Sequence, residues 1–211
     1  GPGVDGGAGN PQNPTGGYVT AYLWETVLRK DSFLDILQKF ISYQKEVKKT
    51  TLPDGKVRTD TAEKIIFPRY HQLDVVRKLV RHTREHGPGH NYLIQHSAGS
   101  GKSNSIAWTA YRLASLHDDE NRAIYNSVII VTDRKVLDSQ LQDTIDSFDH
   151  TLGSVVLIDE KKSSKDLLKA VNDGKRIIVT TLQKFPVIYD LVGDTTGKAF
   201  AIIVDEAHRG Y

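Results

Sequence analysis

Short apolar runs alternate with helix-forming segments from Phe67 to the end of this 211-residue chain, and this alternation restricts the possible folds more than any other feature. Four of the runs are continuously apolar, which is typical of strands that helices cover on both faces. They are SVIIV (127–131), SVVLI (154–158), RIIVT (176–180) and AFAIIV (199–204). We therefore predict an α/β fold, with a mainly parallel sheet sandwiched by helices.

The segments between these runs are predicted as helices, with one further strand. Helices are expected around Val76, Ala110 and Leu141, and a short one after residue 180, while NYLIQ (91–95) is expected to be a strand. Another helix is predicted in SSKDLLKAVNDG (163–174). There Ser163 and Asp166 have the spacing of a capping box, and Gly174 suits the end of a helix.

Composition divides the chain into three parts. Residues 1–17 are rich in glycine and proline, which predicts a linker or a long loop. Residues 18–62 are predicted to form a helical connector segment, in which LPDGK (52–56) marks a turn between two strand-like pieces. Residues 63–211 carry the alternating pattern and are predicted to form one domain.

The totals exclude several classes of protein. The chain contains no cysteine, so disulfides and thiolate zinc sites are impossible. No apolar run is long enough to cross a membrane and no secretory signal is visible, so we expect a cytoplasmic protein with no membrane partner. A net charge of +2 permits nucleic-acid binding without arguing for it. Because the sequence begins with Gly1 and lacks methionine, we interpret it as a fragment.

The segment HSAGSGKS (96–103) follows the predicted strand and precedes a predicted helix. It departs from the phosphate-binding pattern G-x-x-x-x-G-K-[ST] only at His96, so it is either a glycine-rich turn that caps a helix or a phosphate cradle. In a cradle, Lys102 would reach the β- and γ-phosphates of ATP and Ser103 would ligate Mg²⁺. The candidate cofactor-binding residues are Ala98, Gly99, Ser100, Gly101, Lys102 and Ser103.

The last predicted strand ends in Asp205 and Glu206. Phosphoryl transfer requires a ligand for Mg²⁺ and a residue that positions the attacking water, and these two carboxylates suit the two roles in that order. Asp159 and Glu160 also follow a strand, but they continue into a lysine-rich stretch that suggests an exposed charged turn. Lys102, Asp205 and Glu206 are therefore the predicted catalytic residues.

Two further groups of polar residues precede the loop. Gln72 carries an amide able to pair with the N6/N7 edge of adenine, and Arg69 stands three residues before it at a helix start. His82 and His86 have the spacing of a two-histidine metal pair, but no third ligand stands in a suitable place. We interpret these histidines as basic residues at a helix C-terminus.

Taken together, Gln72, HSAGSGKS, VIIVTDRKVLDSQL, IIVTTLQKF and DEAH follow the order of the first RecA-like domain of superfamily 2 helicases and translocases, which this chain resembles. In that superfamily the first loop position is commonly not glycine, which accounts for His96. Across nearly the whole chain, stretches such as TGGYVTAYLWETVLRKDSFLDILQKFI and IFPRYHQLDVVRKL resemble more narrowly the motor (R) subunit of type I restriction enzymes.

The resemblance implies an ATP- and Mg²⁺-dependent translocase on double-stranded DNA, acting with the modification and specificity subunits of a type I restriction complex. Residues 63–211 would be its first RecA-like domain, with the second such domain and the nuclease domain elsewhere in the full-length subunit. Two alternatives remain: a fragment that binds ATP and DNA without turnover, and the RecA-like domain of another DEAH-type helicase acting on RNA.

The resemblance also implies roles for residues outside the nucleotide site. Thr132, Arg134, Thr181 and Lys184 would face the DNA backbone, and His208 would couple the nucleotide to neighbouring elements. The other interpretation of these positions is structural. In that case the two threonines cap helices and Arg134 is solvated.

Overall fold

The structure is a computed structural model of the chain. It describes residues 10–11, 17–51, 57–97, 99–132, 141, 145, 155–158, 162–183 and 197–207. The chain forms two compact units, Gly1–His71 and Gln72–Tyr211, and each unit contains its own sheet.

The first unit begins with two short helices, η1 (Leu23–Val27) and α1 (Lys30–Lys39). Ile36 and Phe40 have no exposed surface, and Ala21 and Val27 are also buried. Both helices lie within the segment 18–62 that was predicted as a helical connector.

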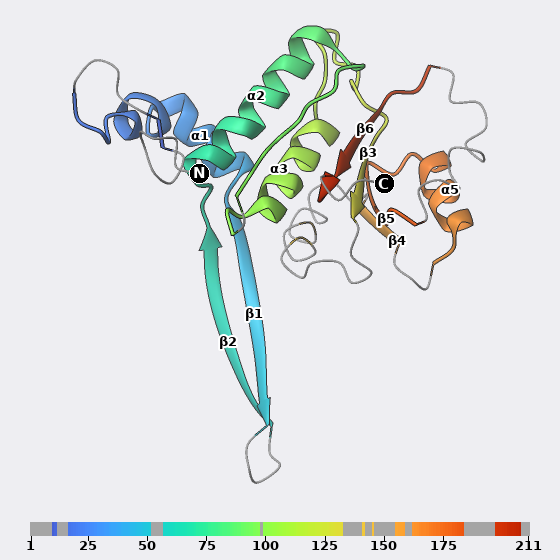
Figure 1. Cartoon of the computed structure of the whole chain (residues 1–211), viewed down its shortest axis with the longest axis horizontal. Coiled ribbons are helices and arrows are strands. Elements are labelled where there is room, and N and C mark those ends of the chain that lie inside the picture. Colours follow the sequence, from blue (N-terminus) through green and yellow to red (C-terminus); the bar gives the residue numbers. More distant parts are fainter. Residues whose placement is uncertain are drawn as a thin grey trace. The chain divides into compact units, whose positions relative to one another are not determined.

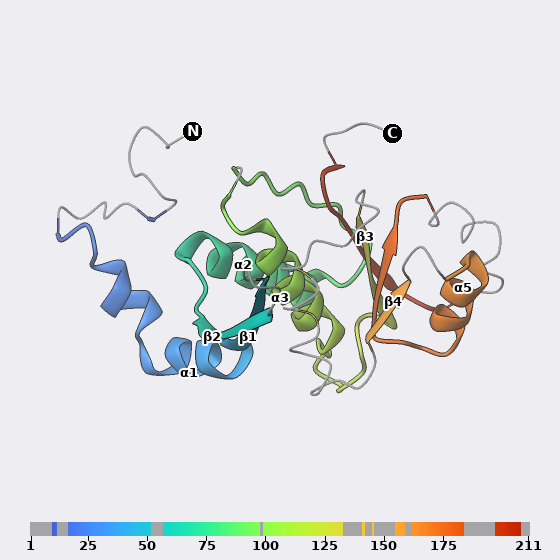
Figure 2. The ribbon, with the colours of Figure 1, turned by 90° about the horizontal axis from the view of Figure 1, so that it is seen from below.

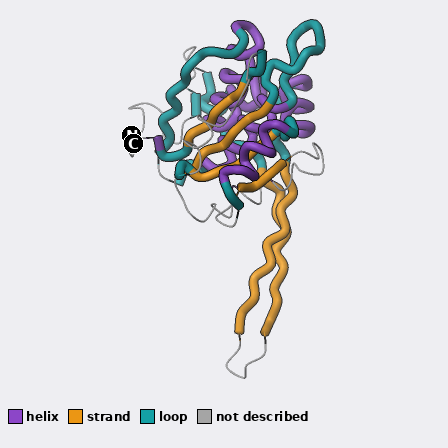
Figure 3. The backbone as a smooth tube through the Cα atoms, turned by 90° about the vertical axis from the view of Figure 1, so that its right-hand side faces the viewer, coloured by secondary structure: helices purple, strands orange, loops and turns teal. Residues whose placement is uncertain are grey.

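A long antiparallel hairpin completes the first unit. Its strands β1 (Ser42–Thr51) and β2 (Val57–Ile66) pair over ten positions, from Ser42 opposite Ile66 to Thr51 opposite Val57. Residues 57–65 are exposed, and no third strand joins the ladder among the described residues. The hairpin is therefore a ribbon with solvent on both faces (Figure 3).

The second unit contains a parallel sheet, as predicted. Its strands are β3 (Ser127–Thr132), β4 (Val155–Ile158), β5 (Ile177–Thr181) and β6 (Phe200–Val204), in the order β4-β5-β3-β6. Every neighbouring pair is parallel. Parallel strands end at the same edge of a sheet, so the carboxyl ends of β3, β5 and β6 lie at one edge.

Helices cover both faces of this sheet (Figures 1 and 2). Helix α3 (Lys102–Ala114) packs on β3, β5 and β6. Helix α5 (Ser164–Asn172) packs on the opposite face, where Leu167 and Ala170 join Ile129 and Ile178 in a buried cluster. The predicted capping box of Ser163 and Asp166 is present, and in it Ser163 N donates a hydrogen bond to the Asp166 carboxylate. Helix α2 (Tyr70–His86) precedes α3 in the chain.

The prediction of a strand at NYLIQ (91–95) is wrong. Residues 91–97 form no strand, and Leu93 is 92% exposed. A strand requires a hydrogen-bonded neighbour, and none of the four described strands of this sheet pairs with this segment. Of the helix predicted around Leu141, only Leu141 and Ile145 are described, both helical and buried. The short helix predicted after β5 lies outside the described residues.

Candidate nucleotide site

The glycine-rich loop turns directly into α3. Gly99 and Gly101 have φ angles of 72° and 82°, in the left-handed region that glycine adopts without steric cost. Gly101 is the N-cap of α3, no side chain caps this helix end, and its first turn carries no acidic residue. The helix N-terminus, with its partial positive charge, is therefore suited to an anion. Ala98 lies outside the described residues.

The acidic pair follows β6 at the sheet's carboxyl edge. Asp205 N donates a hydrogen bond of 2.9 Å to Val131 O, which continues the ladder between β6 and β3 by one residue. The chain then turns at Glu206, whose φ of 54° is unusual for a residue other than glycine. Glu206 N donates to Asp205 Oδ1 at 2.9 Å, so the turn itself orients the Asp205 carboxylate.

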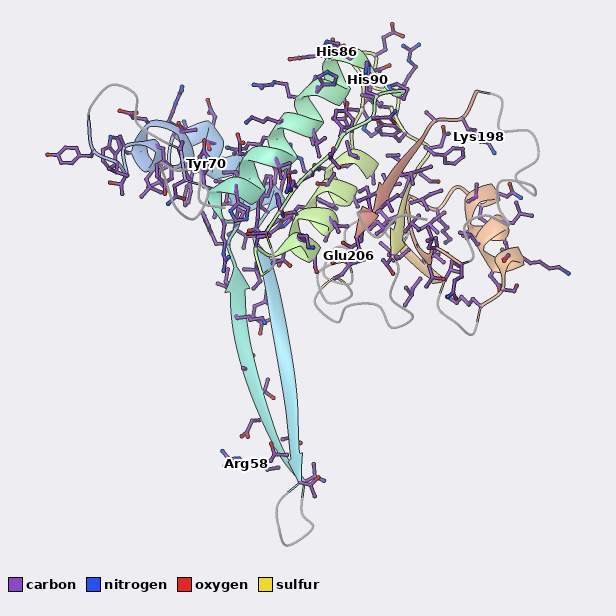
Figure 4. The ribbon with its side chains drawn as sticks, viewed as in Figure 1. Arg58, Tyr70, His86, His90, Lys198 and Glu206 are labelled. Atoms are coloured by element: carbon purple, nitrogen blue, oxygen red, sulfur yellow. The ribbon has the colours of Figure 1, made fainter. Side chains whose placement is uncertain are left out.

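The loop and the acidic pair meet across the sheet edge. Lys102 Nζ lies 3.1 Å from Glu206 Oε1, although the two residues are 104 positions apart in the sequence. The Lys102 side chain is 36% exposed and that of Glu206 is 13% exposed, so the ion pair is only partly buried. Figure 4 shows Glu206 immediately beyond the end of β6.

The Gln72 side chain donates hydrogen bonds to the backbone of the glycine-rich loop. This side chain is buried, with the residue 3% exposed. Its Nε2 donates to Gly101 O at 2.9 Å and to Ser100 O at 3.3 Å. A Cβ at position 101 would lie 2.5 Å from this nitrogen. Sequence reasoning assigned the Gln72 amide to adenine and missed this contact, which a local pattern does not reveal.

The donor types at this edge fit a nucleotide with its metal ion. Ser103 stands in the first turn of α3, and Asp205 follows β6. A hydroxyl and a carboxylate are the hard oxygen ligands that Mg²⁺ prefers, and the ion itself would neutralise phosphate charge. The glycine backbone, the Lys102 ammonium and the α3 N-terminus would contact the phosphates.

Two of the residues predicted to face DNA are described. Thr132 and Thr181 are partners in the register of β3 and β5, at the same sheet edge as Asp205. They are 3% and 7% exposed, which leaves little hydroxyl surface for a DNA phosphate. Arg134, Lys184 and His208 lie outside the described residues. Arg69 is exposed and belongs to the first unit, so its role at the nucleotide stays a prediction.

The histidines at the end of α2 cluster without forming a metal site. The rings of His82 and His86 stack at 4.1 Å, and His90 lies 5.0 Å from His82 in a T-shaped arrangement. Figure 4 labels His86 and His90 at this end of the helix. Among the described residues, no group of three or more histidine, aspartate or glutamate side chains is placed to hold a metal ion. The described part of the chain also contains no helix with the length and apolar character needed to span a membrane.

A parallel sheet between helices, with a glycine loop opening one helix and an acidic pair following a neighbouring strand, defines a RecA-like ATPase domain. The comparison with protein families agrees, because the SWI2/SNF2 ATPase family matches residues 71–211. The chain belongs to this family.

Similarity to individual proteins identifies a narrower group. The chain is a homologue of type I restriction enzyme endonuclease subunits. It is 29% identical over 155 residues to the SauCOLORF180P endonuclease subunit of Staphylococcus aureus (strain COL), covering 71% of this chain and 15% of that protein. It is 27% identical over 192 residues to the HindI endonuclease subunit of Haemophilus influenzae, covering 87% of this chain and 16% of that protein. The chain thus spans about 15% of the length of these relatives.

Proposed function

We propose that this chain binds ATP with Mg²⁺ at the edge formed by α3 and β6, and hydrolyses it to move double-stranded DNA as part of a type I restriction endonuclease subunit. Lys102 contacts the β- and γ-phosphates, Ser103 and Asp205 hold Mg²⁺, and Glu206 positions the attacking water. Modification and specificity subunits, a nuclease domain and a second RecA-like domain are the partners that this function requires.

The contact between Lys102 and Glu206 carries the proposal. Phosphoryl transfer depends on positioning and charge stabilisation, so the phosphate-binding cation and the water-positioning carboxylate must lie within one ligand's reach. At 3.1 Å they do. The match to the ATPase family supports ATP as the ligand. The similarity to restriction-enzyme endonuclease subunits supports DNA as the polymer that is moved.

Substitution of Lys102 tests the nucleotide part of the proposal. The variant Lys102→Ala removes a charge-assisted phosphate contact, and at about 2–3 kcal/mol for such a contact the affinity for MgATP should fall roughly 30- to 150-fold. The measurements are calorimetric titration with MgATP and the rate of phosphate release. Lys165→Ala, which removes an exposed lysine from α5, is the matched control and should leave both unchanged. A binding constant and rate unaffected by Lys102→Ala would contradict the proposal.

Nucleic-acid stimulation separates the proposal from its alternatives. Phosphate release that rises with double-stranded DNA supports a DNA translocase. Stimulation by single-stranded RNA alone supports a DEAH-type RNA helicase. MgATP binding that depends on Lys102 without any release of phosphate supports a binding module that needs further domains for turnover.

A further inference from the structure

The β1–β2 hairpin lies outside the residues that the ATPase family matches. It is also not explained by the nucleotide site. Its strands pair over ten positions, which corresponds to a ribbon roughly 34 Å long, and a two-stranded ribbon without a core is marginally stable in water. The 192-residue similarity to the Haemophilus influenzae subunit is longer than residues 71–211 and therefore extends into the unit that carries the hairpin.

The ribbon carries a net positive charge. Residues 42–66 contain six lysines or arginines and four carboxylates, a formal net charge of +2.

Within the hairpin, the excess lies in the distal half, which is defined here as residues 48–51 of β1 and 57–60 of β2, paired farthest from Ser42 and Ile66. This distal half carries Lys48, Lys49 and Arg58 against Asp60. The base half, residues 42–47 and 61–66, carries Lys45 and Lys64 against Glu46 and Glu63 and is neutral. The distal half also contains the hydroxyl residues Thr50, Thr51 and Thr59. Lysine, arginine and threonine are residue types that contact nucleic-acid phosphates without reading sequence.

The guanidinium of Arg58, in the distal half, can exchange its carboxylate partner for a phosphate. Arg58 Nε lies 2.9 Å from Asp60 Oδ1, and the two side chains are 67% and 53% exposed (Figure 4). An ion pair this exposed contributes little to stability, so a phosphate can replace the carboxylate at small cost.

Apolar surface argues against a protein partner at the same place. Among the described side chains of the ribbon, three large hydrophobic ones are exposed: Tyr43, Val57 and Ile65. Two of these, Tyr43 and Ile65, are in the base half, where they are register partners. Because a protein interface is organised around a buried apolar and aromatic centre, the distal half is better suited to a charged polymer than to a protein surface.

We propose that the distal half of the β1–β2 hairpin, residues 48–51 and 57–60, contacts the phosphate backbone of double-stranded DNA. The inference rests on the proposed function, because it assumes that DNA is the track. It adds a DNA contact that does not depend on base sequence. The residues that make it precede the nucleotide site in the chain and lie outside the family match. The contact acts by releasing counterions from the DNA, so its contribution depends on salt.

Two double variants with equal change of net charge test the inference. Lys49→Gln with Arg58→Gln removes two cations from the distal half, and Lys45→Gln with Lys64→Gln removes two from the base half. Affinity for a labelled DNA duplex is measured by fluorescence anisotropy from about 0.05 to 0.3 M salt. The distal variant should bind at least roughly tenfold more weakly near 0.1 M salt, with the slope of log K against log salt reduced by about 2. The base variant should match the unsubstituted chain.

Three outcomes are decisive. A loss confined to the distal variant, with MgATP affinity unchanged in both variants, supports the inference. Equal affinities for DNA in both variants overturn it, assign the ribbon to another partner and leave the proposed function standing. An unsubstituted chain that binds MgATP but no duplex at any salt concentration overturns both the hairpin contact and the DNA part of the proposed function.

Discussion

Gln72 provides the sharpest test of how the phosphate loop is held. Its amide nitrogen donates to the backbone oxygens of Ser100 and Gly101, at 3.3 and 2.9 Å. We expect the substitution Gln72→Leu to preserve the buried volume while removing both hydrogen bonds. At about 0.5–1.5 kcal/mol for each neutral bond, the loss is about 2 kcal/mol, or roughly 30-fold in the population of the ordered loop.

The assay compares ligands with and without adenine. Binding of ATP, GTP and inorganic tripolyphosphate, each with Mg²⁺, is titrated calorimetrically. If Gln72 acts by holding the loop, Gln72→Leu weakens all three ligands by about the same factor. Gln95→Leu, which changes an exposed glutamine just before the loop, is the control and should weaken none. A loss restricted to ATP would refute the loop-holding role and restore Gln72 as a reader of adenine.

Two predictions concern stability. Arg176 donates to Tyr125 O, Asn126 O and Ala114 O, and burial lowers its pKa. The substitution Arg176→Met should therefore lower the free energy of unfolding in urea by about 3 kcal/mol. The control Arg84→Met removes an exposed ion pair with Asp119 and should cost less than about 1 kcal/mol, and equal costs would contradict the structural role of Arg176. Asp166→Ala removes the acceptor that caps α5 and should cost about 1 kcal/mol in the same assay, whereas no change would mean that the cap is replaced by water.

Much of the second unit could be predicted from the sequence because its signals are local. The apolar runs at 127–131 and 176–180 are buried on both faces, so composition alone indicated strands of a covered parallel sheet. Parallel strands share a carboxyl edge, and this geometry brings Asp205 and Glu206 to the same side as the other strand ends. The family resemblance supplied what spacing did not, namely that His96 is compatible with a phosphate loop.

Other features depend on contacts that no local pattern encodes. NYLIQ has the composition of a strand, yet a strand forms only beside a neighbour, and none is available to it among the described strands. The hairpin was anticipated at its turn but not in its length, because charged residues on both faces hide the alternation that normally marks a strand. The amide of Gln72 could be assigned to the loop only once the helix and the loop were seen together.

The ion pair between Lys102 and Glu206 has a consequence for anion binding at this edge. The Lys102 ammonium has a carboxylate beside it, at 3.1 Å, so a phosphate that binds there competes with an anion that belongs to the protein. A singly charged oxyanion merely exchanges one negative neighbour for another. In the proposed nucleotide site, a triphosphate bound with magnesium would bring several contacts at once and would leave Glu206 available to a water molecule. Competition with the Glu206 carboxylate would therefore favour polyphosphates over orthophosphate.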